Sequence, residues 1–293
     1  MKKILKRNLK IFLKVIKWIL LAAVFVILLG LAAGLIYSGF RRPSLNRNWQ
    51  TEQAVLATAE INGTQVLIHN VRDFKYSSTS TEVFPHYYDA TYDTKDIVGM
   101  DFIVEPFSKI KAYAHTMFSF SFKDGKRVMV SVEIRKQKGD IYNALFGFFN
   151  KYELIYVVGD EKDLLGARAI GSHLKLYMYP VQVSKEKIAE LFLVMMDKVN
   201  LHSVKPEFYN TIFANCTTKL VEAVNVIAEP KIPWSWRYVM PGFSDEYAYS
   251  LKLIDTSVPF AELRNAHFIS DLVAKYQNSP DFSAQIRQRF NTQ

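Results

Sequence analysis

An uninterrupted apolar segment near the N-terminus is the feature that most limits what this chain can fold into. Residues 18–37 carry no charged side chain. A helix of this length, at roughly 1.5 Å per residue, spans a hydrocarbon core of about 30 Å. A cleavable signal peptide would have a shorter apolar region, although the small residues Ala32, Ala33 and Gly34 leave cleavage open. The segment therefore predicts one transmembrane helix over residues 18–37.

The charges that flank this segment predict its orientation. Residues 1–17 hold seven basic side chains and no acidic one, whereas only three arginines follow the apolar segment closely. Basic residues stay on the cytoplasmic side of a membrane helix. We therefore expect a cytoplasmic segment at residues 1–17, a tether at residues 38–48, and an external catalytic-like domain at residues 49–293.

The net charge of +9 does not predict a nucleic-acid partner. Residues 1–42 hold nine of the 37 basic residues and none of the 28 acidic ones, so the remaining residues hold 28 of each. The external domain is electrically neutral, and the basic residues belong to the anchor, where they suit anionic lipid headgroups. We therefore expect a membrane partner and no nucleic acid.

The external region is predicted to be rich in strands first and in helices later. This order is typical of an α+β domain with an antiparallel sheet. Strands are expected at residues 57–61, 65–70, 99–104, 112–122, 126–134, 153–158 and 174–180. Helices are expected at residues 140–150, 185–199, 216–229 and, weakly, 260–290.

The single cysteine, Cys216, falls at the start of one predicted helix. Asn215 precedes it, where an N-cap residue belongs. As the first helical residue, Cys216 would meet the positive end of the helix dipole, which lowers a thiol pKa. A lone cysteine is more often buried and inert. It cannot form an intramolecular disulfide, however, so an oxidising compartment gives no structural reason to keep it, and we interpret Cys216 as a nucleophile.

A second reactive side chain, His115, lies in the hairpin predicted over residues 112–134. Its Asp-Gly turn allows either a two-residue turn or a three-residue loop with Gly125 in the left-handed region. Only the three-residue loop sets phenylalanines opposite valines and keeps one coherent apolar face. That register places His115 opposite Glu133, whose carboxylate would orient the imidazole. A polar pair on a solvated face is the alternative.

Several separated motifs resemble the Lnb N-terminal periplasmic domain family, over about residues 46–246. They are Asn46–Trp49, Asn70–Phe74, Ala114–Thr116, Ser131–Arg135, Tyr152–Glu161, Tyr209–Thr211, Asn215–Thr217 and Pro241–Glu246. The order, with histidine before the Asn-Cys pair, is also similar to permuted papain-like folds of the NlpC and lecithin:retinol acyltransferase types. The resemblance implies a bacterial inner-membrane protein with a periplasmic domain and Cys–His thioester chemistry. It also implies a lipoprotein transacylase, which moves a fatty acyl chain from glycerol to the amino group of a lipidated cysteine.

These observations predict a membrane-anchored cysteine acyltransferase or hydrolase that acts on lipid or lipoprotein. A non-enzymatic binding module and an amidase or peptidase of cell-wall peptide are the alternatives. The proposed catalytic residues are Cys216, His115 and Glu133; candidates for oxyanion or supporting contacts are Asn215, Asn210 and Ser131; candidates for substrate contacts are Arg135, Arg72 and Tyr209. The scattered histidines predict no metal site, and we expect no cofactor. The aromatic runs at residues 145–149 and 234–236 are expected in the core, with an acyl groove or the membrane interface as alternatives.

Overall fold

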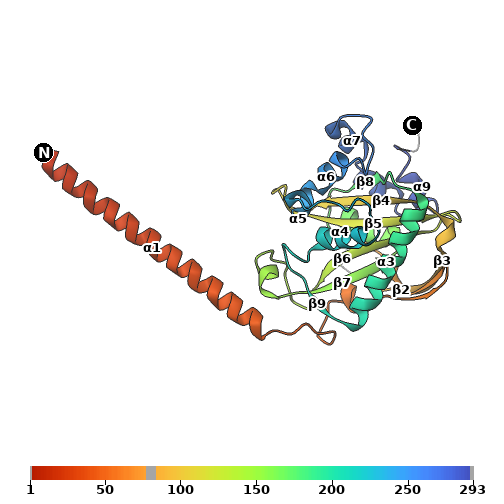
Figure 1. The fold of residues 1–293 in the computed structure, drawn as a ribbon, viewed down its shortest axis with the longest axis horizontal. Coiled ribbons are helices and arrows are strands. Elements are labelled where there is room, and N and C mark those ends of the chain that lie inside the picture. Colours follow the sequence, from red (N-terminus) through yellow and green to blue (C-terminus); the bar gives the residue numbers. More distant parts are fainter. Residues whose placement is uncertain (1, 77–83, 291–293) are drawn as a thin grey trace.

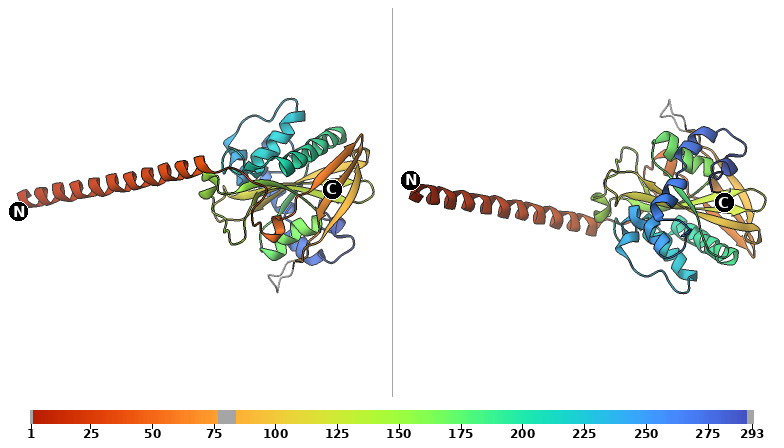
Figure 2. Two further views of the ribbon diagram at one scale, coloured as in Figure 1. Left: turned by 90° about the horizontal axis from the view of Figure 1, so that it is seen from below. Right: turned by 90° about the horizontal axis from the view of Figure 1, so that it is seen from above.

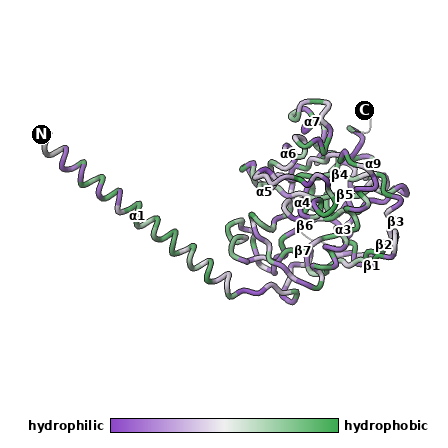
Figure 3. The backbone as a smooth tube through the Cα atoms, viewed as in Figure 1, coloured by the Kyte–Doolittle hydropathy of each residue, from purple (hydrophilic) through white to green (hydrophobic). Residues whose placement is uncertain are grey.

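A long N-terminal helix projects from a folded domain. The computed structural model describes residues 2–76 and 84–290. Helix α1 (Lys2–Phe40) is long and apolar enough over Lys6–Phe40 to cross a membrane, and the rest of the chain does not bury it. Figure 1 shows it extending away from the domain, and Figure 3 shows its long hydrophobic stretch. The predicted membrane segment therefore lies within a longer helix that includes the basic residues and the start of the predicted tether.

One mixed sheet of nine strands forms the centre of the described domain. The strands are β1 (Thr58–Asn62), β2 (Gln65–Arg72), β3 (Tyr87–Asp93), β4 (Ile97–Pro106), β5 (Ala114–Phe122), β6 (Arg127–Arg135), β7 (Glu153–Gly159), β8 (Tyr177–Pro180) and β9 (Glu207–Phe208). Their spatial order is β1-β2-β7-β6-β5-β4-β8, with β3 beside β2 and β9 beside β7. The pairings are antiparallel except for one parallel residue pair between β2 and β7.

Helices cover both faces of the sheet, as Figure 2 shows. The helices after α1 are α2 (Glu161–Gly166), α3 (Lys185–Val204), α4 (Cys216–Ile227), α5 (Trp236–Val239), α6 (Ser244–Ser250), α7 (Phe260–Ala266), α8 (Ser270–Tyr276) and α9 (Phe282–Gln285). Helices α3 and α4 pack on one face, against Phe120 and Val130, and form the larger core. Helices α2, α8 and α9 cover the other face, against Met117 and Met129. Both faces of the central strands are buried, so the sheet carries two apolar cores.

The predicted α+β class and the predicted hairpin register are confirmed. Gly125 adopts a positive φ of 85°, and the Phe122 amide donates to the Lys126 carbonyl oxygen across a three-residue loop. Phe118 pairs with Val130, as the buried-face criterion requires. A two-residue turn would have moved every side chain to the opposite face.

Two strands and several short helices were not predicted. Strand β3 pairs only with β2 and is half exposed, so its sequence lacks a clear apolar alternation. The helix predicted at residues 140–150 is only a 3-10 turn at Phe146–Phe149. That turn ends at Asn150, whose φ of 54° lies in the left-handed region. The helices predicted at 185–199 and 216–229 are present as α3 and α4.

Candidate active site

Helix α4 begins at Cys216 because its N-terminus is fully capped. The Asn215 side chain accepts the Thr218 amide at 2.9 Å, and the Thr218 hydroxyl accepts the Asn215 amide at 2.8 Å. This reciprocal pair satisfies two amides that the first helical turn leaves without intrahelical partners. The predicted N-cap is confirmed, and it fixes the thiol at the end of the helix.

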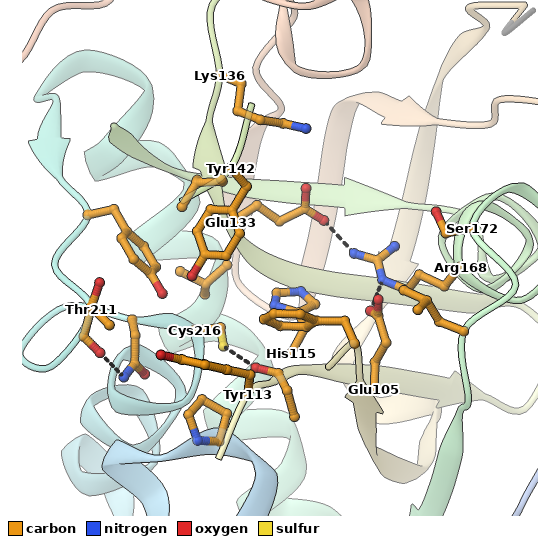
Figure 4. Close-up of a pocket in the computed structure, with 18 of the residues that line it drawn as sticks. Glu105, Tyr113, His115, Glu133, Lys136, Tyr142, Arg168, Ser172, Thr211 and Cys216 are labelled. Atoms are coloured by element: carbon orange, nitrogen blue, oxygen red, sulfur yellow. Dashed lines mark hydrogen bonds and ion pairs between the residues drawn. The ribbon is translucent and has the colours of Figure 1, made fainter. Parts of the chain in front are cut away.

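The Cys216 thiol faces a cavity of about 700 Å³ at one end of the sheet. His115, Glu133 and Cys216 all line this cavity, as Figure 4 shows. The Sγ atom lies 4.0 Å from the carbonyl oxygen of Ala114, the residue immediately before His115. Residues about 100 positions apart in sequence therefore meet in one site.

The hairpin opens where the cavity enters it. The pairing of β5 with β6 ends at Met117 and Ser131, although β5 continues to pair with β4 and β6 with β7. The ladder therefore stops before His115 and Glu133, the two residues that the predicted register sets opposite each other. The cross-strand partner of His115 is Glu105 on β4. Because the two strands separate, one cavity reaches both His115 on one face of the sheet and Cys216 on α4, which packs on the other.

Ser131 connects His115 to Glu133. The Ser131 hydroxyl donates to Glu133 Oε1 at 2.9 Å, and its oxygen lies 2.7 Å from His115 Nε2. Because the hydroxyl proton is used toward the carboxylate, the serine oxygen accepts from a protonated Nε2. The other ring nitrogen, Nδ1, then carries the lone pair. The chain of contacts thus favours the tautomer in which Nδ1 is the ring nitrogen that can accept a proton.

Arg168 contacts the carboxylates of both Glu105 and Glu133. Its Nε lies 2.6 Å from Glu105 Oε2, and its Nη2 lies 2.7 Å from Glu133 Oε1. Burial raises the pKa of Glu105 to about 7. The charge of Arg168 opposes this shift, and the charge of Glu133 adds to it. Burial also favours a higher pKa at Glu133, but the charges of Arg168, His115 and Arg72 outweigh it and lower that pKa to about 2. Glu133 is therefore an ionised acceptor for Ser131 at neutral pH.

Burial favours the neutral forms of both Cys216 and His115. Burial, with the Arg168 charge, lowers the pKa of His115 to about 3. Burial also raises the pKa of the Cys216 thiol above its ordinary value of 9.0, although amides and hydroxyls of Thr116 and Thr217 oppose the shift. The prediction of a lowered thiol pKa is therefore wrong, because desolvation exceeds the effect of the helix terminus.

The buried thiol makes a testable prediction for alkylation. In the free protein, iodoacetamide should label Cys216 slowly at pH 7, and the rate should rise through pH 9 as the thiolate forms. The chain has no other cysteine, so mass spectrometry of intact protein reports this site alone. A Cys216→Ser variant gives the background. Fast labelling at pH 6 would instead indicate a preformed thiolate.

Of the three residues predicted to contact substrate, Tyr209 and Arg72 line the cavity and Arg135 does not. Tyr209 lines the cavity, as predicted for a substrate contact, and its hydroxyl is hydrogen-bonded to that of Tyr142. Arg72 also lines the cavity, but its guanidinium makes two 2.8 Å contacts with the Asp163 carboxylate and so is already paired. Arg135 is not among the residues that line the cavity. It donates to the backbone oxygens of residues 53 and 54.

The two asparagines do not supply an oxyanion donor. Both protons of the Asn215 side-chain amide are used, toward the carbonyl oxygens of Thr211 and Val239 at 2.9 Å each. Asn210 accepts two amides of its own turn and is not among the residues that line the cavity. The hydrogen bonds of both side chains therefore stabilise the loop before α4, and a supporting role for Asn215, which lines the cavity, stays a prediction.

Sequence reasoning missed Glu105 and the importance of Arg168 and Lys136. Glu105 is an acidic residue within a strand that is otherwise mostly buried, which is the signal that could have found it. Of the three Lys or Arg residues that line the cavity, Arg72 and Arg168 pair with carboxylates, and Lys136 has no acidic partner among the described residues. Within residues 2–76 and 84–290, no cluster of three or more His, Cys, Asp or Glu side chains could hold a metal ion.

Comparisons with known proteins identify a family. Neither the curated proteins nor the solved structures include a match to this chain. A family model described as the Lnb N-terminal periplasmic domain matches residues 83–242, which is more than half of the 293 residues. The matched range contains Cys216, His115, Ser131 and Glu133. Together with helix α1, this match indicates a membrane-associated protein of the cell envelope. The chain belongs to the Lnb N-terminal periplasmic domain family.

Proposed function

We propose that this protein is a membrane-anchored cysteine acyltransferase that works through an acyl-thioester on Cys216. The observation that carries the proposal is the chain from Glu133 through Ser131 to His115, in the cavity that Cys216 also lines. A nucleophile, a base and a group that orients the base are the parts that acyl transfer needs. Hydrolysis is the same reaction with water as the acyl acceptor.

The first half-reaction moves the acyl group to the enzyme. His115 Nδ1 takes the thiol proton as Sγ attacks the carbonyl carbon of an ester. The C–O bond then breaks, and the imidazolium returns the proton to the leaving alkoxide. Glu133, through Ser131, stabilises the transient positive charge on the ring, which is what an orienting carboxylate contributes.

The second half-reaction releases the acyl group. An amine attacks the thioester carbonyl and gives its proton to His115, which passes it to Sγ as the C–S bond breaks. The negative oxygen formed in each half-reaction would meet the backbone amide of Cys216 at the start of α4. The hydroxyl of Tyr209 lies close enough for a thiolate charge on Cys216 to raise its pKa, which makes Tyr209 a candidate second donor.

The cavity lining supports an acyl substrate. Aromatic and aliphatic side chains contribute most of its wall, among them Phe107, Tyr142, Phe148 and Met240. Such a lining suits a fatty acyl chain better than a cell-wall peptide, whose polar groups would lose hydration. Lys136, without an acidic partner among the described residues, is placed to meet the phosphate of a lipid donor or another anion.

We also propose that the N-terminus is cytoplasmic and that the domain faces the periplasm. The excess of basic residues before the apolar segment supports this orientation. In this arrangement the cavity meets lipids of the outer leaflet and lipoproteins attached to the same membrane.

Trapping the acyl-enzyme tests the function. Full-length protein in nanodiscs of phosphatidylethanolamine and phosphatidylglycerol should gain the mass of one acyl chain on Cys216, and hydroxylamine should remove it because thioesters react with that reagent. Adding a diacylated lipopeptide with a free amino group should discharge the enzyme and lengthen the lipopeptide by the same mass. The Cys216→Ala variant should gain no mass. A wild-type protein that binds these lipids without any acyl mass would favour the binding-module alternative.

A further inference from the structure

Large apolar side chains are exposed on segments whose neighbouring residues, such as Tyr142 and Ile212, line the cavity. Six of them come from two loops and the segment that leads into α5, and we call them the docking surface: Ile141, Leu145, Phe146, Phe213, Trp234 and Trp236. Ile141, Phe213 and Trp234 are 86%, 82% and 76% exposed. The expectation that residues 145–149 and 234–236 pack in the core is therefore wrong for these side chains. A concentration of such residues on one part of a surface indicates an interaction site.

The docking surface lies on the side of the domain from which α1 emerges. Phe149 packs on α1 so closely that a side-chain carbon at Gly34 would lie 2.6 Å from its ring. One residue further, the Asn150 amide donates to the Ser38 carbonyl oxygen at 3.3 Å. Figures 1 and 2 show this turn beside the end of α1, and Figure 1 shows α5 on the same side. Gly34 lies inside the predicted membrane segment, so the turn at Phe146–Phe149 reaches the level of the lipid.

We propose that the docking surface inserts into the outer leaflet of the bilayer that α1 crosses. The contact with Gly34 indicates that lipid covers the docking surface. A surface that adjoins a membrane helix at this depth meets lipid before it meets another protein. Two of the six side chains are tryptophans, which suit the boundary between headgroups and acyl chains. The docking surface would add a second membrane contact to that of α1. A short irregular segment after Phe40 connects α1 to the domain.

Insertion would give the acyl donor a route that avoids water. A second hollow of about 370 Å³, lined by Phe213, Trp234 and Trp236, shares Ile212 and Met240 with the wall of the Cys216 cavity. The apolar surface therefore continues from the membrane side of the domain into the site. This inference deepens the proposed function, since it names membrane lipid as the source of the acyl group, but insertion itself does not depend on catalysis.

Depth measurement with a fluorescent label tests the insertion. In full-length Cys216→Ser protein, Ile141→Cys and Phe213→Cys each give a single attachment point for the environment-sensitive NBD fluorophore, at a position exposed enough not to disturb packing. Asp124→Cys is the matched control, because its turn lies at the opposite end of β5 from His115. The carrier is a nanodisc of phosphatidylethanolamine and phosphatidylglycerol with doxyl-labelled lipid as quencher.

The two membrane-side labels should emit at shorter wavelength than the control, and lipid-borne quencher should act at least about twofold more strongly on them. Emission and quenching equal to those at position 124 would overturn the proposal. A blue shift without quenching would also overturn it, because the surface would then be covered by protein.

An activity measurement separates this inference from the proposed function. Replacing Phe146 and Phe213 together with glutamine should raise KM for membrane phospholipid about tenfold and leave turnover of a short, water-soluble ester unchanged. Quenched labels with no acyl transfer would retain the docking surface and remove the proposed function. Unquenched labels with normal acyl transfer would retain the proposed function and remove the docking surface.

Discussion

Replacing Cys216 with alanine should abolish acyl transfer, and replacing His115 with alanine should reduce it at least about a thousandfold. In the proposed mechanism, the first change removes the atom that carries the acyl group, and the second removes the base that accepts the thiol proton during attack. Losses of this size follow when a nucleophile or its base is removed from an enzyme of this type. The double variant should be no slower than Cys216→Ala alone, because the two residues act as one unit.

A partial loss of activity at Ser131 would distinguish a specific role of the Glu133–Ser131–His115 contacts from a general disturbance of the sheet. Ser131→Ala should lower kcat by roughly ten- to a hundredfold, because His115 keeps its place but loses the contact that fixes its tautomer. Ser119→Ala is the matched control. Ser119 is equally buried on the same face and also donates to a carboxylate, that of Glu161 at 2.6 Å, but it does not line the cavity. Equal losses of activity at both serines would contradict a specific role for Ser131.

Arg168→Met should destabilise the domain by about 3–5 kcal/mol, because it leaves two buried carboxylates without a counter-charge. The Arg168 guanidinium now contacts Glu105 and Glu133, whose side chains are 7% and 15% exposed. For a domain of this size, the melting temperature should fall by roughly 2–4 °C for each kcal/mol. Adding Glu105→Gln should restore part of this loss, since one buried negative charge disappears.

The destabilisation should grow with pH. Without Arg168, its charge no longer opposes the effect of burial, so the folded-state pKa of each carboxyl rises above its value in the unsubstituted protein, about 7 for Glu105 and about 2 for Glu133. The folded variant then holds protons that the folded unsubstituted protein has released, so its stability falls relative to that protein as pH rises from about 2, and the difference continues to grow past pH 7. Arg289→Met is the control, because its pair with Asp271 is largely exposed and should contribute less than about 1 kcal/mol. A destabilisation independent of pH would indicate lost packing only.

Local signals made much of this fold predictable. The apolar segment, the Asn-Cys start of α4 and the loop at Gly125 each depend on neighbours within a few residues, and all three are present. The hairpin register was also predictable, because a slip by one residue would have exposed its apolar face. Strand β3 escaped prediction because an edge strand needs no continuous apolar pattern.

The arrangement of the site depends on contacts that no local pattern encodes. Glu105, Glu133 and Arg168 come from β4, β6 and the π-helical turn after α2, and only the packed sheet brings them to one point. The opening of the hairpin beyond Met117 replaced a direct pair of His115 and Glu133 with a link through Ser131.

By itself, the sequence determined the long apolar N-terminal helix, the α+β class and the position of Cys216 at a helix start, because hydrophobic length, periodicity and capping act over short stretches of chain. The tertiary structure alone decided the charge state of the site and the exposure of the aromatic loops. Both depend on burial, which is a property of the whole fold: it raised the pKa of the Cys216 thiol against the helix terminus, and it left Phe213 and Trp234 outside the core.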